Sequence, residues 1–270
     1  MSIIAHLTDI HMVEPEARRP GGLTAAARRG FLNLGRAIDE GGRRRSFAEA
    51  LGRAMALGFD HLVVTGDLTE EGTLQQFEAV ASVLDEAGVN PARVTLLPGN
   101  HDVYAHANAW VDALEGPLKA YARTSAPGML VELADLVLAP VSTTRAQRWW
   151  RSAGEVSSPE RRCIALALQT AARRGVAALI AQHHPPTRVH RAAWHWFDGL
   201  LDHAAMRPVL RALENTYVLH GHLHQRRDDR FEGESLAHIF GAAAVVEDPG
   251  ALRRYQVVGE TLVPIEVAAS

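Results

Sequence analysis

Short apolar runs that end in polar turns recur along this chain, and no other feature of the sequence constrains its fold as strongly. The runs are IIAHL at 3–7, HLVVT at 61–65, RVTLL at 93–97, VAALIA at 176–181 and TYVLH at 216–220. Segments with apolar residues at every third or fourth position lie among them, at 46–57, 74–87, 108–122, 159–174 and 203–214. Buried strands that alternate with amphipathic helices predict βαβ units and a largely parallel sheet covered by helices.

The last part of the chain has a different pattern. From residue 225 onward, HIFGAAAVV and RRYQVVGETLVPIEV indicate short strands joined by turns, as in an antiparallel second sheet. The sequence contains no internal repeat, no low-complexity segment and no linker rich in proline and glycine. With 270 residues and 47% hydrophobic content, we expect one α/β domain spanning 1–270.

Composition and the N-terminal stretch bear on where the protein acts. The single cysteine, Cys163, cannot form an intrachain disulfide, which suits a reducing compartment. The first residues lack the basic region of a signal peptide, and no run approaches the ~20 apolar residues of a membrane span. A net charge of -3 gives no long-range attraction to nucleic acid or to an anionic membrane. We expect a cytoplasmic protein with neither as its partner.

Each apolar run is followed at once by residues that can bind metal or move protons. The turns read TDIH at 8–11, GDLTE at 66–70, PGNHD at 98–102, QHHPP at 182–186 and GHLH at 221–224. In open α/β sheets, functional groups gather beyond the carboxyl ends of the strands, so the five turns are predicted to converge on one site. The candidate ligands are Asp9, His11, Asp67, Asn100, His183, His222 and His224.

This donor set mixes carboxylate, amide and imidazole and contains no thiolate. It exceeds the four ligands of one tetrahedral zinc, and it suits two divalent ions drawn from Mn, Fe, Co or Zn. Two ions about 3.5–4 Å apart can share a carboxylate, for which Asp67 is the candidate. Taken singly, each residue has a plainer interpretation, since Asp and Asn are common in turns and helix caps.

The ordered series D-x-H, G-D-x-x-E, G-N-H-D, H-H-P and G-H-x-H between residues 9 and 224 resembles the calcineurin-like metallophosphoesterase superfamily. The resemblance implies a four-layer αββα sandwich, in which two mixed central sheets are flanked by helices and a dinuclear metal site lies at the strand ends. It also implies that one metal is held by Asp9, His11, Asp67 and His224. The other would be held by Asp67, Asn100, His183 and His222.

The same resemblance implies a reaction and two further residues. A metal-bridging hydroxide would attack phosphorus, while His101 stabilises the transition state or protonates the leaving oxygen. Glu70 would hold that imidazole, although a carboxylate near a helix start is also favoured by the helix dipole alone. Compact bacterial members that resemble this chain suggest a small organic phosphodiester substrate, of cyclic nucleotide or glycerophosphodiester type.

Three alternatives remain open from the sequence. A phosphomonoesterase or a nucleotide pyrophosphatase would use the same dinuclear site. A non-catalytic binding scaffold is the alternative of another class, and the presence of His101 with all candidate ligands argues against it.

Other histidines and two further segments have plainer interpretations. His6, His61 and His220 are predicted to be packing residues in or beside strands, and His184 to face away from the site. Segment 16–45 carries eight arginines against three acids and is interpreted as a solvated face, with a phosphate-binding flap as the alternative. Trp194, Trp196 and Phe197 are predicted to pack in the core, with stacking on a base as the alternative.

Overall fold

The computed structural model describes residues 1–19, 23–33, 36–188, 191–212, 215–230 and 237–267. Its strands are β1 Ile3–Leu7, β2 His61–Val64, β3 Val94–Leu96, β4 Val131–Glu132, β5 Leu136–Pro140, β6 Ala177–Ala181, β7 Thr216–His220, β8 Arg227–Arg230, β9 His238–Gly241, β10 Arg253–Val258 and β11 Thr261–Ile265. Its helices are α1 Leu23–Leu32, α2 Glu40–Leu57, α3 Leu74–Glu86, α4 Ala109–Glu115, α5 Ala122–Ser125, α6 Ser158–Arg174, α7 Ala192–Asp198 and α8 His203–Leu210.

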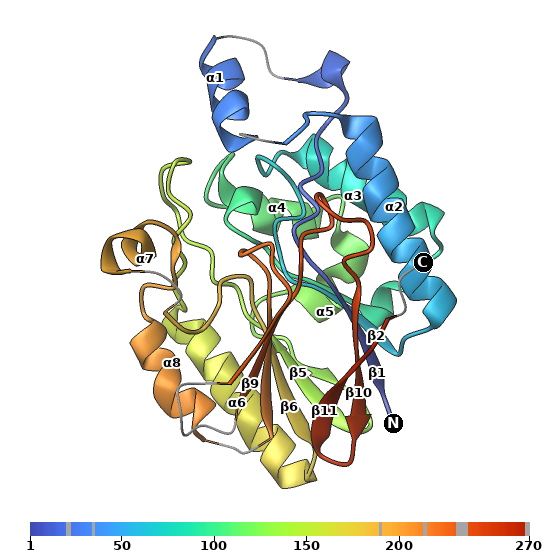
Figure 1. Ribbon diagram of the computed structural model, residues 1–270, viewed down its shortest axis with the longest axis vertical. Coiled ribbons are helices and arrows are strands. Elements are labelled where there is room, and N and C mark those ends of the chain that lie inside the picture. The colour runs from blue at the N-terminus through green and yellow to red at the C-terminus, as the bar shows by residue number, and fades with distance from the viewer. Residues whose placement is uncertain (20–22, 34–35, 189–190, 213–214, 231–236, 268–270) are drawn as a thin grey trace.

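The strands form two mixed sheets (Figure 1). The first has the order β11-β10-β1-β2-β3, in which β1, β2 and β3 are parallel and β10 and β11 are antiparallel. The second has the order β4-β5-β6-β7-β9-β8, with four parallel strands in the middle and an antiparallel strand at each edge. The carboxyl ends of β1, β2, β3, β6 and β7 therefore meet along one rim of the molecule.

Three apolar clusters separate the layers. Alternate residues of β1 point to opposite faces: Ala5 and Leu7 join the cluster beneath α2 and α3, whereas Ile4 joins the cluster between the sheets. In β6, Leu179 lies in that same inter-sheet cluster, and Ile180 packs with the residues of α6. Helices, two facing sheets and helices again give the predicted four-layer αββα sandwich, which is confirmed.

The prediction of a separate antiparallel sheet at the C-terminus is wrong. β10 and β11 extend the first sheet, while β9 pairs with β7 in parallel and β8 closes the edge of the second sheet. The parallel strands divide between both sheets, because the chain crosses from the first sheet to the second between β3 and β4. Hydrophobic periodicity identifies strands but not their partners, so this division is not visible in the sequence.

The five predicted strands are present, with ends that move by at most a residue or two. β5 was not predicted, although its run LVLAP is fully buried between β4 and β6 in the second sheet. The predicted helix at 108–122 is divided into α4 and α5, and α2 begins earlier than expected, at Glu40. Of the helices that the structure describes, none combines the length and apolar character needed to cross a bilayer.

Candidate metal centre

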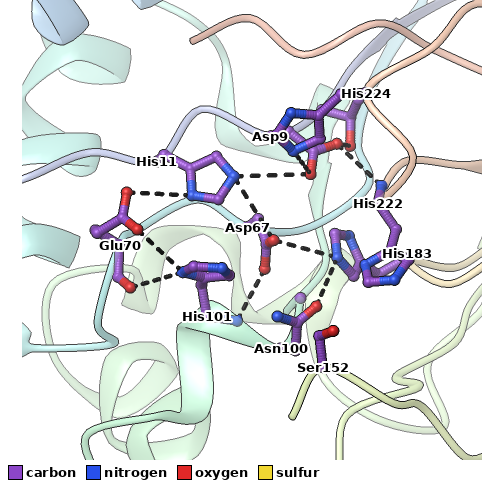
Figure 2. A network of polar contacts seen from close by, with 12 residues as sticks. Asp9, His11, Asp67, Glu70, Asn100, His101, Ser152, His183, His222 and His224 are labelled. Carbon is purple, nitrogen blue, oxygen red and sulfur yellow. Dashed lines mark hydrogen bonds and ion pairs between the residues drawn. The ribbon is translucent and has the colours of Figure 1, made fainter. Parts of the chain in front are cut away.

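The predicted ligands meet at the rim where strands of both sheets end (Figure 2). Asp9 and His11 follow β1, Asp67 follows β2, and Asn100 follows β3, all in the first sheet. The second sheet supplies the remaining three, from the turns after β6 and β7: His183, His222 and His224. All but His222 and His224 are buried, and these two are partly buried.

The backbone at this rim is strained. Asp9, His11, Asp67, His222 and His224 have φ angles between 49° and 68°, and they are the non-glycine residues with positive φ in the described part of the chain. The left-handed region costs a residue with a side chain roughly 1–2 kcal/mol. Five such residues at one place indicate that the fold holds these side chains in position against local backbone preference.

Two glycines in the motifs leave room for ligand side chains. A Cβ added at Gly221 would overlap the Thr8 hydroxyl and lie 2.5 Å from Asp9 Oδ2. A Cβ added at Gly99 would overlap the Asp67 carboxylate. Here glycine is required because the backbone passes directly against a carboxylate.

Asp67 lies between two groups of potential donors. Its Oδ2 is 3.7 Å from His11 Nε2 and 3.3 Å from His183 Nε2, and the same His183 nitrogen is 3.2 Å from Asn100 Oδ1. On the other side, Asp9 Oδ1 is 3.2 Å from His224 Nε2 and 3.9 Å from His11 Nε2. The donors thus converge as two overlapping sets that meet at one carboxylate.

Each of the four imidazoles has one ring nitrogen beside an oxygen that can only accept a hydrogen bond. His183 Nδ1 donates to the Thr65 carbonyl (2.7 Å), and His222 Nε2 donates to the Asp198 carbonyl (2.7 Å). His224 Nδ1 is 2.6 Å from Glu247 Oε1, and His11 Nδ1 is 3.4 Å from Glu70 Oε2. A proton on that nitrogen leaves the other with a lone pair, which is the arrangement of metal-ligating histidines.

Three buried polar atoms at the centre have no hydrogen bond among the described residues: Asp9 Oδ1 and both ring nitrogens of His11, of which Nδ1 keeps only its 3.4 Å contact with Glu70. Asp9 Oδ1 and His11 Nε2 lie 3.9 Å apart. An unsatisfied buried acceptor costs about 1–3 kcal/mol, so native structures seldom tolerate two together. A cation between them would satisfy both, and the donor set of carboxylate, amide and imidazole suits a divalent ion. The residues therefore fit a metal.

The electrostatics also favour cations. Burial alone would lower the pKa of His183 and His224, but the carboxylates of Asp67 and Asp9, respectively, outweigh it and raise both values to about 9. Burial together with neighbouring positive charge lowers the pKa of His222 to about 3. Carboxylates that raise the pKa of two imidazoles in this way give the site a negative electrostatic potential. That potential also attracts metal cations.

Glu70 is the hub of a second network beside the ligands. Its Oε1 is 3.3 Å from His101 Nδ1 and 3.4 Å from Arg36 Nη2, and its Oε2 is 2.6 Å from the buried Arg43 Nη1. The His101 ring nitrogen lies closer still, at 2.8 Å, to the backbone carbonyl of Glu70. Since α3 begins only at Leu74, these contacts, rather than the helix dipole, account for the placement of this carboxylate.

Burial alone would lower the pKa of His101. The negative charge of Asp67 and the contact with Glu70 outweigh burial and raise that pKa above its ordinary value. Nδ1 of His101 is held by Glu70, and the residue lines the pocket. This geometry suits a residue that donates a proton to a substrate oxygen.

The site opens into a pocket of about 400 Å³. Besides predicted residues, its lining includes four that were not predicted to take part: Arg36, Ser152, Asp198 and Glu247. Arg36, Ser152 and Glu247 lie in connections and Asp198 ends α7, and none of the four belongs to a recognisable motif. The signal that identifies Asp198 and Glu247 is their contact with ligand imidazoles, which depends on tertiary structure.

The structure corrects two predictions about the flanking segments. Trp194 and Trp196 are 65% and 54% exposed, so they do not pack in the core; the short helix α7 holds them at the surface. Segment 16–45 is not simply solvated, because Arg43 is buried against Glu70, and Arg28 pairs with Glu71 at 2.8 Å. Among the described residues lining the pocket, Arg36 is the only lysine or arginine.

Three histidines outside the ligand set lie where they were predicted. His6 Nε2 and His61 Nε2 are each 2.8 Å from a threonine hydroxyl of the neighbouring strand. His220 contacts the Gly221 carbonyl through Nδ1 at 2.9 Å. The prediction that His184 faces away is wrong, because its ring packs against His222 with centroids 4.5 Å apart; both of its ring nitrogens are nevertheless occupied, by the Thr143 hydroxyl and the Ser152 carbonyl.

Comparisons with known proteins agree with this geometry. The family model described as calcineurin-like phosphoesterase matches residues 3–226. A 3′,5′-cyclic-nucleotide phosphodiesterase of Nostoc sp. (strain PCC 7120) is 25% identical over 228 residues, covering 82% of this chain and 71% of the relative.

Solved structures share the fold. A dimetal phosphatase from Danio rerio superposes with a TM-score of 0.68 at 15% identity, covering 98% of both chains. A protein from Thermus thermophilus superposes with a TM-score of 0.54 at 10% identity, covering 97% of both chains. At these identities the likeness concerns the fold alone.

Proposed function

Because the chain belongs to the calcineurin-like phosphoesterase family, we propose that it is a dinuclear metal-dependent phosphodiesterase acting on a small organic phosphodiester. Family membership makes it a hydrolase of phosphate esters. The preference for a diester is supported by its similarity to the Nostoc protein named as a cyclic-nucleotide phosphodiesterase.

One observation carries the proposal of two metals. Three imidazoles are hydrogen-bonded through one nitrogen, and both nitrogens of the fourth, His11, are without a hydrogen bond among the described residues, as is Asp9 Oδ1. We assign one ion to Asp9, His11, Asp67 and His224, and the other to Asp67, Asn100, His183 and His222. Asp67 is shared because it lies within 4 Å of donors of both sets. The metals are drawn from Mn, Fe, Co or Zn.

When bound, two divalent cations neutralise phosphate oxygens and make hydroxide available near neutral pH. The chain's own residues supply the rest. His101 delivers a proton to the departing oxygen, and Glu70 orients its imidazole through carbonyl and carboxylate. Arg43 and Arg36 hold Glu70 in place by ion pairs. Arg36 also provides positive charge at the pocket wall for a phosphate oxygen.

Two wider expectations accompany this function. Both sheets share the inter-sheet core, so we propose that they form one domain. We also propose a cytoplasmic location, since the buried Cys163 is a free thiol.

The test compares hydrolysis of bis(p-nitrophenyl) phosphate and p-nitrophenyl phosphate by metal-stripped protein resupplied with Mn, Fe, Co or Zn. We expect metal-restored turnover that favours the diester and is lost in Asn100→Ala. Preference for the monoester would move the assignment to a phosphomonoesterase. Absence of turnover with every metal would favour a binding scaffold.

A further inference from the structure

An aromatic wall stands beside the pocket. Four of the five tryptophans lie in two short segments, 149–150 and 194–196. The structure joins these segments: Ser152 N donates to the Phe197 carbonyl (3.1 Å), and Trp150 stacks on Phe197 with ring centroids 6.1 Å apart. We use the term aromatic wall for Trp149, Trp150, Trp194, Trp196 and Phe197.

Specific contacts hold the two segments of the aromatic wall together. The Arg151 guanidinium lies over the Trp196 ring, 4.1 Å from its centroid, and donates two hydrogen bonds to the Trp196 carbonyl at 3.0 and 2.9 Å. Both segments then run directly into the pocket, because Ser152 and Asp198 line it. Aromatic surface and polar pocket are therefore continuous.

A residue of α1 also contacts the aromatic wall. Phe31, at the end of α1, meets Trp149 edge to face, with centroids 5.1 Å apart at 76°. The neighbouring Leu32 carbonyl accepts a hydrogen bond from the Arg36 guanidinium at 2.7 Å. The Phe31–Trp149 pair thus joins the side of the pocket that carries Arg36 to the side that carries Ser152.

The pocket lining and the Phe31–Trp149 pair differ in chemistry. Every residue that lines the pocket in the described chain is polar, whereas the pair is aromatic, and its Phe31 is 52% exposed. A ligand that matches both must carry a phosphate at one end and a planar ring at the other. A nucleotide has this form, and bases stack on aromatic side chains with little dependence on sequence.

We propose that the Phe31–Trp149 pair is a binding subsite for the base of a nucleotide whose phosphate lies in the pocket. The position of the phosphate rests on the proposed function. The subsite makes a nucleotide, and not a glycerophosphodiester, the substrate class. A lipid surface would use exposed aromatic residues differently, since it needs no contact with the pocket.

The test measures binding of AMP and of ribose 5-phosphate to metal-loaded protein by calorimetry. The two ligands share phosphate and ribose and differ only in the base. We expect AMP to bind about tenfold more tightly, as one base stack provides. Phe31→Ala and Trp149→Ala should abolish this advantage and leave ribose 5-phosphate binding unchanged. Leu166→Ala, which removes a 46% exposed side chain from α6, is the matched control and should retain the advantage.

Three results would overturn the subsite: equal affinity for both ligands in the unaltered protein, equal loss for both in the variants, or variants that bind like the unaltered protein. Co-sedimentation with phosphatidylserine vesicles that is lost in Trp149→Ala would assign the wall to a membrane surface instead. Because binding needs no turnover, failure of the subsite and failure of the phosphodiesterase assignment remain distinguishable.

Discussion

The buried histidines inside the strands differ from those at the strand ends. His6 and His61 are as inaccessible as His11 and His183, yet each bonds a hydroxyl of the next strand and serves packing. His11 and His183 instead each have one nitrogen beside an oxygen of the chain and the other facing the Asp67 carboxylate. Burial alone therefore does not distinguish a ligand from a core residue; what distinguishes them is where the second nitrogen points.

The largest expected effect separates the two groups by activity. His183→Ala removes a proposed ligand and should lower metal-restored turnover about a thousandfold, comparable to losing a key electrostatic contact in other active sites. His61→Gln retains a hydrogen-bonding side chain beside Thr95 and should leave the turnover of folded protein unchanged. Initial rates with bis(p-nitrophenyl) phosphate measure both. Equal losses in the two variants would erase the distinction.

Replacing a glycine at the rim and a glycine in a surface helix by alanine should change the free energy of unfolding in opposite directions. Gly221→Ala places a methyl group against Thr8 and Asp9, and it should destabilise the fold by about 3 kcal/mol through overpacking. Gly52→Ala, in an exposed position of α2 with nothing within 4 Å of the added carbon, should stabilise by roughly 0.5–1 kcal/mol. Urea unfolding of the metal-free proteins gives both numbers. An unchanged free energy of unfolding in Gly221→Ala would show that Thr8 and Asp9 can move to accommodate the added methyl group.

A third prediction concerns a buried acid outside the ligand set. Burial raises the pKa of Glu160, in α6, from 4.5 to about 7, and its Oε2 has no partner among the described residues. The folded state therefore holds the proton more tightly than the unfolded state. The resulting stability is present below pH 4.5 and is lost as the pH rises through about 7, a change of about 3 kcal/mol.

Glu160→Gln should flatten this part of the stability profile, measured by urea unfolding between pH 5 and pH 8, and should be the more stable protein at pH 8. The unaltered protein should lose stability over the same range. A profile that keeps its slope in Glu160→Gln would assign the pH dependence to another group.

The smallest expected effect concerns the residue that anchors a ligand. Glu247→Gln weakens the contact with His224 Nδ1, and it should lower the affinity for one metal about tenfold, as loss of such supporting contacts does elsewhere. Competition with a chromogenic chelator measures that affinity. Glu260→Gln, in the turn between β10 and β11, is the control and should not alter it. An unchanged affinity in Glu247→Gln would limit the anchoring role to the other three imidazoles.

Sequence reasoning succeeded for the features that are local in the chain. The runs that became β1, β2, β3, β6 and β7 end in the turns where the ligand candidates lie. Parallel strands predicted that those turns converge, and the family resemblance that the turns carry implied the layers. Sequence reasoning failed for features that depend on residues distant in the chain. These are the pairing of β9 with β7, the burial of Arg43 and the exposure of Trp194. Asp198 and Glu247 belong to no motif and acquire a role only through contact.

The division of the site between the two sheets has a mechanical consequence. The first sheet supplies Asp9, His11, Asp67 and Asn100, and the second supplies His183, His222 and His224. In the proposed holoenzyme the two ions would link the two sheets at one rim. The chain has a single cysteine and so cannot link them by an intrachain disulfide. Any sliding of one sheet over the other would then alter the spacing of the ions. Substitutions deep in the inter-sheet core, such as at Leu179 or Phe240, should therefore tune turnover from a distance.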